Sequence, residues 1–401
     1  MENNIARKIT IHYAAVFAVY FAAFCMVRSF ISVYLLDMGF TYTQAGLITG
    51  IHMFIAAAVQ PNFSLILDRF PKGLRHFIAL CCIPAVICSA LTFFVPANLF
   101  VFILIYLVFA VCEVGLQSLM ISVGMEYVNA GIPINAGLGR GFGSIGYSAA
   151  NLLLGNMIVR FGSPVSHKLN IALMLLLAVL IITMPDPNSL KTGENREKTE
   201  EEDTAPSDDP VTFLRGNRIF ALFTLSVIFI FLGHSTVNIY MPNVAAQFGL
   251  GTDFTGMLNS LAAGLELIPM MFYSRITKKI SPLTLLYISA FFFTAKILTT
   301  TLAVNGTGLL IAQTMQMLAY ALFTMASIYF ANQAVRPHNR VMAQGMLTGA
   351  GEIGFTIGSL VGGIVLDHRT IRTLLWMAVA ATVIGSVLMA AAVTQFKRKT
   401  A

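Results

Sequence analysis

Apolar residues dominate this chain in long runs, and short polar segments separate one run from the next. Runs of this length suffice to cross the hydrocarbon core of a membrane, which takes about 20 helical residues. Backbone N–H and C=O groups in lipid must bond within their own segment, so each run is predicted to be a helix. Twelve spans are expected, at residues 12–36, 43–67, 76–96, 98–123, 137–160, 167–184, 218–241, 253–274, 282–303, 306–331, 341–366 and 370–393. The predicted fold class is an all-α membrane protein with twelve transmembrane helices.

Four glycines of one apolar run recur in a second run, each 208 residues further along the chain. They are Gly141, Gly143, Gly146 and Gly155, matched by Gly349, Gly351, Gly354 and Gly363. A repeat over half the chain predicts two pseudo-symmetric six-helix bundles, an arrangement used by many secondary transporters. The expected boundaries are 1–184 for the N-terminal bundle and 216–401 for the C-terminal bundle, with a cytoplasmic linker at 185–215 between them.

The segment 185–215 is the longest polar stretch of the chain. Its residues 200–209 include six acidic side chains, and four prolines lie between 185 and 210. This composition is typical of a flexible tether. A regulatory role for the segment is the alternative.

Composition supports the membrane interpretation, since 57% of the residues are hydrophobic and 11% are charged. Soluble domains average about 25% charged residues, so most of this apolar surface is expected to face lipid. The five cysteines, Cys25, Cys81, Cys82, Cys88 and Cys112, all fall inside predicted spans and are interpreted as packing residues. No metal, no cofactor and no enzymatic activity are expected, because no phosphate-binding loop, zinc-ligand helix or nucleophile motif is found.

The distribution of lysine and arginine predicts the orientation in the membrane. With the N-terminus in the cytoplasm, 18 of the 25 basic residues fall in cytoplasmic segments and 4 on the opposite side. The other three, Arg28, Arg140 and Lys296, lie within spans or at their edges. We therefore expect a multi-pass protein of the cytoplasmic membrane with both termini in the cytoplasm. The net charge of +7 reflects this topology, and no nucleic-acid partner is expected.

Two glycine patterns, Gly141–Gly146 and Gly349–Gly354, match a dinucleotide-binding fingerprint. That fingerprint has meaning between a strand and a helix, whereas both matches fall inside predicted membrane spans. Small residues four apart allow helices to approach closely in membranes, which is the interpretation favoured here. The sets that fit it are Gly139/Gly143, Gly345/Gly349 and Gly354/Gly358/Gly362.

The segment that follows the second span reads SLILDRFPKGLR, from Ser64 to Arg75. Its Asp68–Arg69 pair and the basic residues after it resemble the signature loop of the major facilitator superfamily. The usual leading glycine of that loop is Ser64 in this chain. The resemblance implies a gating loop that contains Asp68 and Arg69, while ordinary positive-inside charge is the alternative.

The resemblance extends over nearly the whole chain and implies the twelve-helix major facilitator fold and a functional monomer. The motif RGFGSIGY, Arg140–Tyr147, and the upstream Glu126 resemble the oligosaccharide:proton symporter, nucleoside symporter and sugar-efflux branch. The motif LELIPM, Leu265–Met270, resembles the sugar-efflux members, and Lys296 stands where such relatives often carry an arginine. The branch implies a substrate-binding charge pair of Arg140 and Glu126, although their spacing of 14 residues is shorter than in the lactose-type members.

Ionisable side chains inside spans cost about 2.5–3.5 kcal/mol each on insertion scales, so they are candidate functional residues. Glu266, Glu352 and Glu113 are the proton-coupling candidates, because a carboxyl in a low-dielectric site can exchange a proton near neutral pH. Glu266 and Lys296 are the preferred pair, since both lie near the middle of adjacent spans. Polar residues that share a helix face add substrate-binding candidates. The full substrate-binding set is Arg140, Glu126, Lys296, Arg28, His234, Asn238, Gln313 and Gln316. Static bridges that stabilise helix packing are the alternative for each buried charge.

These observations predict a secondary active transporter that moves a small organic solute by alternating access, with proton coupling and with a sugar or sugar-like substrate favoured. Drug efflux by proton antiport is the alternative, because 20 Met and 31 Phe would suit an adaptable apolar pocket. A membrane-embedded enzyme or sensor is a third class. The expected partners are the solute, protons and the lipid bilayer. The direction of transport and the choice of proton or sodium stay open.

Overall fold

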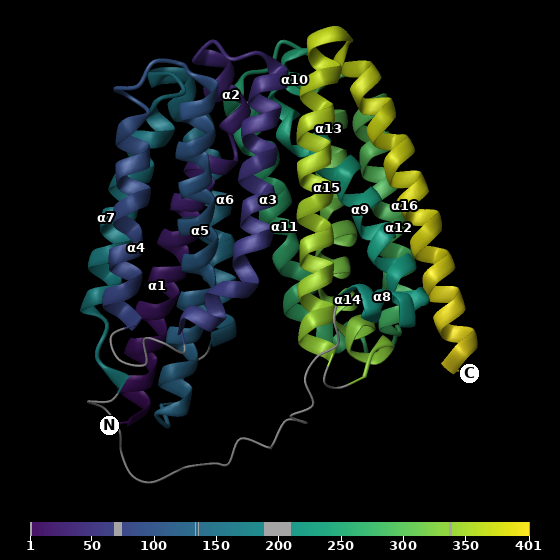
Figure 1. Ribbon diagram of the computed structural model, residues 1–401, viewed down its shortest axis with the longest axis horizontal. Helices are drawn as coiled ribbons and strands as arrows, with labels where there is room; N and C mark the ends of the chain where they lie inside the picture. Colours follow the sequence, from purple (N-terminus) through teal and green to yellow (C-terminus); the bar gives the residue numbers. More distant parts are fainter. Residues whose placement is uncertain are drawn as a thin grey trace. The chain divides into compact units, whose positions relative to one another are not determined.

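The structure, a computed structural model, describes residues 2–67, 74–132, 134, 136–187, 210–336 and 339–400. These residues form helices and connecting turns, and none of them lies in a β-strand (Figure 1). The helices of the first half are α1 (Glu2–Arg28), α2 (Ile31–Asp37), α3 (Tyr42–Leu67), α4 (Leu74–Leu91), α5 (Leu99–Asn129), α6 (Ala136–Phe161) and α7 (Val165–Thr183). Those of the second half are α8 (Pro210–Gly216), α9 (Arg218–Ile239), α10 (Met241–Ala246), α11 (Thr252–Ile276), α12 (Pro282–Leu302), α13 (Gly306–Thr314), the π-helix η2 (Met317–Ala321), α14 (Leu322–Ala334), α15 (Arg340–His368) and α16 (Ile371–Thr400). Each predicted span is occupied by helix, so the all-α fold is confirmed.

Two of the predicted spans are interrupted. The first divides into α1 and α2 near Ser29. The seventh is filled by α9 and ends where the short helix α10 begins, with Pro242 in the first turn of α10. The tenth consists of α13, η2 and α14. A π-helical turn is wider than an α-helical one and frequently marks a functional site.

Ten helical segments in the described part of the chain are long and apolar enough to cross a membrane, and α3 and α11 are not among them. Helix α11 contains Asp253, Glu266 and Arg275, which lower its hydropathy. Large apolar side chains such as Phe100 and Phe291 are exposed on the spanning helices. Exposed apolar surface on this scale is expected where a helix faces lipid. The chain is therefore a multi-pass membrane protein.

The chain divides into two compact units by its internal contacts. Unit 1 comprises Met1–Phe40, Ala58–Lys198 and Thr252–Ser260, and thus includes the first turns of α11. Unit 2 comprises Thr41–Ala57, Thr199–Gly251 and Leu261–Ala401, and thus includes the first part of α3. Most of the predicted linker 185–215 lies outside the described residues.

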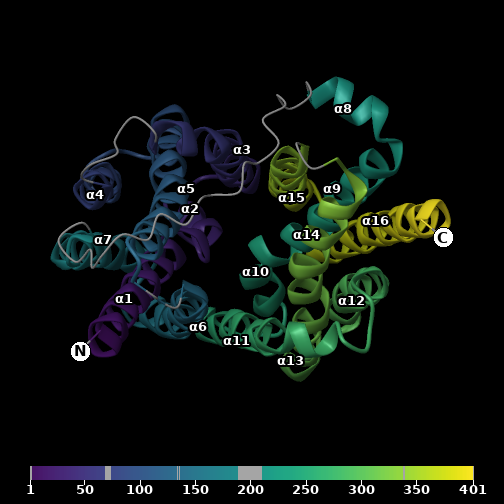
Figure 2. The same ribbon diagram turned by 90° about the horizontal axis from the view of Figure 1, so that it is seen from below.

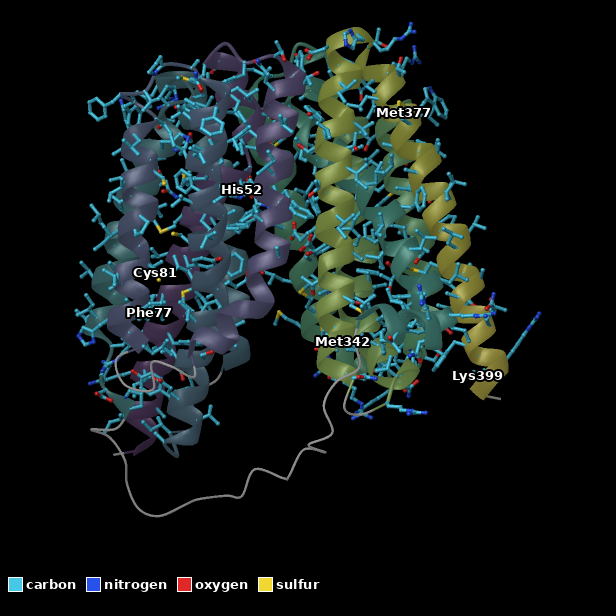
Figure 3. The ribbon with its side chains drawn as sticks, in the orientation of Figure 1. His52, Phe77, Cys81, Met342, Met377 and Lys399 are labelled. Atoms are coloured by element: carbon cyan, nitrogen blue, oxygen red, sulfur yellow. The ribbon has the colours of Figure 1, made fainter. Side chains whose placement is uncertain are left out.

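In unit 1, helix α6 packs along α1 and α4 packs along α7, which can be followed from below in Figure 2. Glycines of α6 make the first of these contacts close. A Cβ at Gly146 would lie 2.3 Å from the carbonyl oxygen of Ala18, and one at Gly143 would lie 2.5 Å from the Phe21 ring. Four of the five cysteines are buried in this unit as free thiols, and Cys81 of α4 is half-buried (Figure 3). The packing interpretation is confirmed for these cysteines and for Gly143.

In unit 2, helix α15 packs along α9 through a second glycine face. A Cβ at Gly354 would lie 2.6 Å from the carbonyl oxygen of Ile228, and one at Gly358 would lie 2.6 Å from that of Leu232. Packing by Gly354, Gly358 and Gly362 is thus confirmed. For Gly345/Gly349 no packing contact is found among the described residues, where a Cβ at either position would meet no atom within 4 Å.

A carboxylate at the end of α15 holds the first turn of α3 within unit 2. Oδ1 of Asp367 accepts the backbone N–H of Tyr42 at 3.0 Å, and Oδ2 accepts that of Thr43 at 2.8 Å. The first N–H groups of a helix have no partner inside the helix, and negative charge there also interacts favourably with the helix dipole. Asp367 therefore caps α3 from another helix.

Replacing Asp367 by asparagine is expected to destabilise the folded protein by about 1 kcal/mol, the usual range for a lost helix cap. The amide has no charge and one acceptor oxygen instead of two. Thermal unfolding of the detergent-solubilised protein measures the effect. Asp37→Asn at the exposed end of α2 is the control, and an equal shift in both variants would contradict the capping role.

Candidate functional site

Four helical elements of unit 2 bring buried and half-buried polar side chains together, with His234, Lys296 and Gln316 buried and Asn238 and Glu266 half-buried. Helix α9 supplies His234 and Asn238, α11 supplies Glu266, α12 supplies Lys296, and Gln316 lies immediately before η2. All five were predicted site residues. Since each lies inside an otherwise apolar span, their side chains must satisfy one another rather than water.

Lys296 is the centre of this group, and 1% of its surface is exposed. Its Nζ donates to Oε1 of Gln316 at 2.7 Å and to Oδ1 of Asn238 at 3.4 Å. A lysine ammonium donates and has no acceptor. The positive charge of Lys296 therefore orients both amides, with their oxygens toward it and their NH₂ groups away from it.

The NH₂ group of Gln316 reaches Glu266. Its Nε2 donates to Oε1 of Glu266 at 2.7 Å. Glu266 also interacts electrostatically with Lys296. The structure thus brings the predicted pair Glu266 and Lys296 together through a third residue, and sequence reasoning did not assign that bridging position to Gln316.

The NH₂ group of Asn238 faces His234. Its Nδ2 lies 2.9 Å from Nε2 of His234. Because the amide oxygen points to Lys296, Nε2 accepts and the proton of the neutral imidazole lies on Nδ1. Nδ1 is buried and has no hydrogen-bond partner in the part of the chain that the structure describes.

Aromatic rings surround His234 within unit 2. Tyr320 stacks on the imidazole at 5.9 Å between centroids and an interplanar angle of 17°. Phe293 and Phe231 contact it edge-on at 5.3 and 5.9 Å, and Phe355 lies at 6.3 Å. The site therefore combines flat apolar faces with a fixed set of hydrogen-bonding groups.

Unit 2 contains two further predicted residues, Gln313 and Glu352. Gln313 is buried, and its Nε2 lies 3.9 Å from the sulfur of Met241. Glu352 is half-buried on α15, where its backbone oxygen accepts the hydroxyl of Thr356. Glu352 lies one turn before Phe355, which contacts the rings around His234.

Unit 1 contains a fully buried carboxyl. Glu113 of α5 is fully buried, and its backbone oxygen accepts the hydroxyl of Tyr20 at 2.6 Å. Arg28, near the end of α1, interacts electrostatically with Glu113 and lies 5.0 Å from the centroid of the Phe24 ring. The structure therefore relates Arg28 to a proton-coupling candidate, whereas the sequence indicated a substrate contact.

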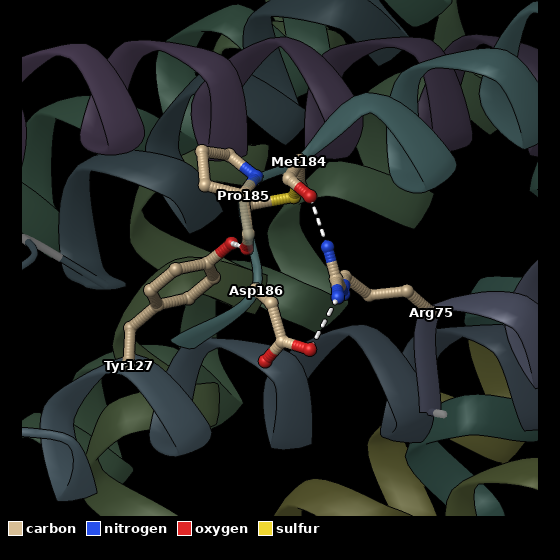
Figure 4. A network of polar contacts seen from close by, with 5 residues as sticks. All are labelled: Arg75, Tyr127, Met184, Pro185 and Asp186. Atoms are coloured by element: carbon tan, nitrogen blue, oxygen red, sulfur yellow. Dashed lines mark hydrogen bonds and ion pairs between the residues drawn. The ribbon is translucent and has the colours of Figure 1, made fainter. Parts of the chain in front are cut away.

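Glu126 is half-buried near the end of α5, and Arg75 of α4 acts on it electrostatically. Arg75 also donates to the carbonyl oxygen of Met184 and pairs with Asp186 at 3.2 Å (Figure 4). The Tyr127 hydroxyl donates to the carbonyl oxygen of Pro185. Together these contacts hold the chain where it leaves α7, a role for Arg75 that charge counting alone did not indicate.

Three predicted residues cannot be placed by their side chains. Asp68 and Arg69 of the predicted gating loop lie outside the described residues, and so does the side chain of Arg140 in α6. The pairing of Arg140 with Glu126 stays a prediction.

A polar cluster that the sequence did not indicate lies around His167 in unit 1. Its Nε2 lies 3.2 Å from the hydroxyl of Tyr106, and its Nδ1 lies 3.4 Å from that of Ser89. Ser89 also donates to Asn170 at 2.8 Å, and Asn170 donates to the backbone oxygen of Ala23. The available signal was a histidine and an asparagine three residues apart on an apolar helix.

None of the curated proteins compared matches this chain in sequence. Solved structures of transporters match nearly its whole length. A variant of the nucleoside transporter NupG matches with a TM-score of 0.79 and 15% identity over 96% of this chain and 99% of that chain. A bacterial homolog of the human lysosomal transporter Spinster, inward-facing and unoccupied, gives 0.75 and 14%, with 98% of each chain covered. The POT family transporter PepTSo gives 0.75 and 13%, also with 98% of each chain covered.

At these identities the likeness shows the fold alone, and the three structures that share it are membrane transporters. The MFS_1-like family model matches residues 10–378, so the chain belongs to this family of major facilitator transporters. The resemblance seen in the sequence is thereby confirmed at the level of the superfamily.

Proposed function

We propose that this protein is a proton-coupled secondary transporter of a small polar organic solute, a sugar or a sugar-like compound. The observation that carries the proposal is the network in which buried Lys296 and Gln316 contact half-buried Glu266. Charges inside membrane-spanning helices are costly and are retained chiefly where ions, protons or substrates move.

Glu266, Glu113 and Glu352 are the proposed proton carriers. Each lies within a predicted span, and two of them interact with a buried or half-buried cation, Glu266 with Lys296 and Glu113 with Arg28. Such an arrangement has two states of similar energy, with the carboxyl either charged beside the cation or protonated and released from it. Alternating between them couples proton movement to a conformational change.

The proposed solute has a ring and several hydroxyl groups. Flat aromatic faces around His234 suit a ring, and the imidazole and amide groups suit hydroxyl and carbonyl groups. Nucleosides fall within this class because they carry a ribose, and one structurally similar protein is the nucleoside transporter NupG. Arg140, Glu126, Arg28 and Gln313 are proposed as further contacts.

The proposed topology places both termini and the linker 185–215 in the cytoplasm, with the protein in the cytoplasmic membrane. It rests on the excess of lysine and arginine, 18 against 4, on that side. The linker joins the two six-helix bundles, and Asp68 and Arg69 belong to a loop that stabilises one conformational state. The working unit is a monomer.

Transport by purified protein in proteoliposomes tests the function. With an imposed pH gradient, accumulation of labelled uridine or melibiose is expected, and a protonophore should abolish it. Protein-free liposomes and the Glu266→Gln variant are the controls. Gradient-dependent movement of neither solute would contradict the proposal, and movement of ethidium alone would favour drug efflux instead.

A further inference from the structure

An amide between a cation and a carboxylate has one orientation that satisfies both. The oxygen of Gln316 faces Lys296, a group that only donates, and its NH₂ faces Glu266, which accepts when ionised. Rotating the amide by half a turn would place two donors together at Lys296 and two acceptors together at Glu266. The Gln316 amide therefore keeps one orientation as long as Lys296 and Glu266 are both charged.

The strength of this bridge depends on the charge at each end. Hydrogen bonds to ionised groups are about twice as strong as those between neutral groups. When Glu266 takes up a proton, its bond from Gln316 becomes a neutral one. Lys296 then loses part of the stabilisation that it receives from Glu266 through the polarised amide.

The same lysine holds a second amide, that of Asn238. Asn238 accepts from Lys296 at 3.4 Å and contacts Nε2 of His234 at 2.9 Å. The bond at 3.4 Å is longer than that to Gln316 at 2.7 Å, so Lys296 is held mainly on the Glu266 side. Weakening the Gln316 bond favours movement of the ammonium toward Asn238.

Two titratable groups of the described residues interact electrostatically with Lys296. They are Glu266 on α11 and His234 on α9. The phenol of Tyr320, from η2, stacks on His234, and Glu352 of α15 lies one turn from Phe355 at the same ring cluster. Of these groups, Glu266 is the one connected to Lys296 by the Gln316 amide.

We propose that Gln316 is the coupling residue of unit 2. It passes the protonation state of Glu266 to Lys296 and, through Asn238, to His234, whose Nδ1–H is the donor offered to a solute acceptor. The effect of Gln316 on transport rests on the proposed function. The hydrogen-bonded bridge between Glu266 and Lys296 is present without any solute. Gln316 acts through its neighbours and is a positioning residue.

The first test requires no solute. A double-mutant cycle of Glu266→Gln and Lys296→Met is measured by thermal unfolding of the full-length protein, in the parent and with Gln316→Met added. We expect a coupling free energy between the two positions in the parent, and it should fall to less than about half when Gln316 is replaced. Residues in one network show such coupling, whereas the effects of mutating separated residues are additive. An undiminished coupling would overturn the proposal.

The second test separates proton coupling from solute binding in proteoliposomes, with uridine and melibiose as the probes. For Gln316→Met, accumulation driven by a pH gradient should fall about tenfold or more and lose its dependence on pH, while exchange at equal pH is largely kept. Ser289→Ala is the matched control, since it removes a buried hydrogen bond from α12 to Ala319 without touching the bridge. Parental accumulation by Gln316→Met would overturn the inference.

If Gln316→Met does not fold, Gln316→Asn is used as the second variant. It keeps the amide but is one methylene shorter, so it cannot reach both ends, and the same losses are expected. If the parent protein moves neither probe, the proposed function fails, and the thermal cycle still decides whether Gln316 couples the two charges.

Discussion

Replacing Lys296 by methionine is expected to abolish solute accumulation driven by a pH gradient. The methionine side chain fills nearly the same space, so helix packing is kept while the charge is removed. Glu266 then loses its nearby cation, and the amides of Gln316 and Asn238 lose the donor that orients them. Removing one partner from a buried charged network costs about 3–5 kcal/mol of stability, so the unfolding temperature should fall together with the loss of accumulation.

The controls separate a lost charge from a lost fold. Lys168→Met on α7 removes an exposed lysine and should leave accumulation unchanged. Adding Glu266→Gln to Lys296→Met restores neutrality, so the thermal stability should recover while accumulation stays absent. Transport by Lys296→Met at the parental rate would show that Lys296 is a static packing element.

A second large effect is expected at the glycine face of α15. The Gly354→Leu variant should unfold at a much lower temperature than the parent or fail to fold. A Cβ at Gly354 would lie 2.6 Å from the backbone oxygen of Ile228 and 2.9 Å from the backbone nitrogen of Leu232. Backbone atoms of a packed helix cannot rotate away as a side chain can, so α9 and α15 must separate, at a cost of about 3 kcal/mol or more.

Gly345→Leu on the same helix is the matched control. No atom would lie within 4 Å of a Cβ at this position, so the added side chain has room. Thermal unfolding and the monodisperse fraction in detergent measure both variants. Equal losses at Gly345 and Gly354 would mean that helix propensity, and not the contact with α9, governs the effect.

The helical spans were predictable because their requirement is local. A run of apolar residues long enough to cross the membrane must form a helix, whatever its neighbours do. The glycine repeat likewise predicted close packing, which the contacts of Gly143 and Gly354 confirm. The same spacing at Gly345 does not correspond to a close helix contact among the described residues. Spacing shows that residues share a helix face, but not which neighbouring helix that face contacts.

The polar site was predictable in its members and not in its connections. The free-energy cost of an ionisable side chain in lipid was enough to indicate Glu266 and Lys296 as candidate site residues, because such groups are rare inside spans. The bridge by Gln316 depends on where α11, α12 and the π-helical turn meet, and a π-helical turn has no clear sequence signal in this chain. The contacts of Arg75 with Met184 and Asp186 could not be predicted either, because they join segments 109 or more residues apart in the sequence.

The sequence by itself determined the kind of membrane-spanning element, the internal repeat and the set of charges inside the predicted spans. These follow from the length of apolar runs and from the cost of a charge in lipid, both of which are properties of single segments. Only the tertiary structure decided which glycines touch a neighbouring helix and which amide lies between Lys296 and Glu266. Hydrogen bonds act over about 3 Å, so their partners are settled by how the helices pack against one another.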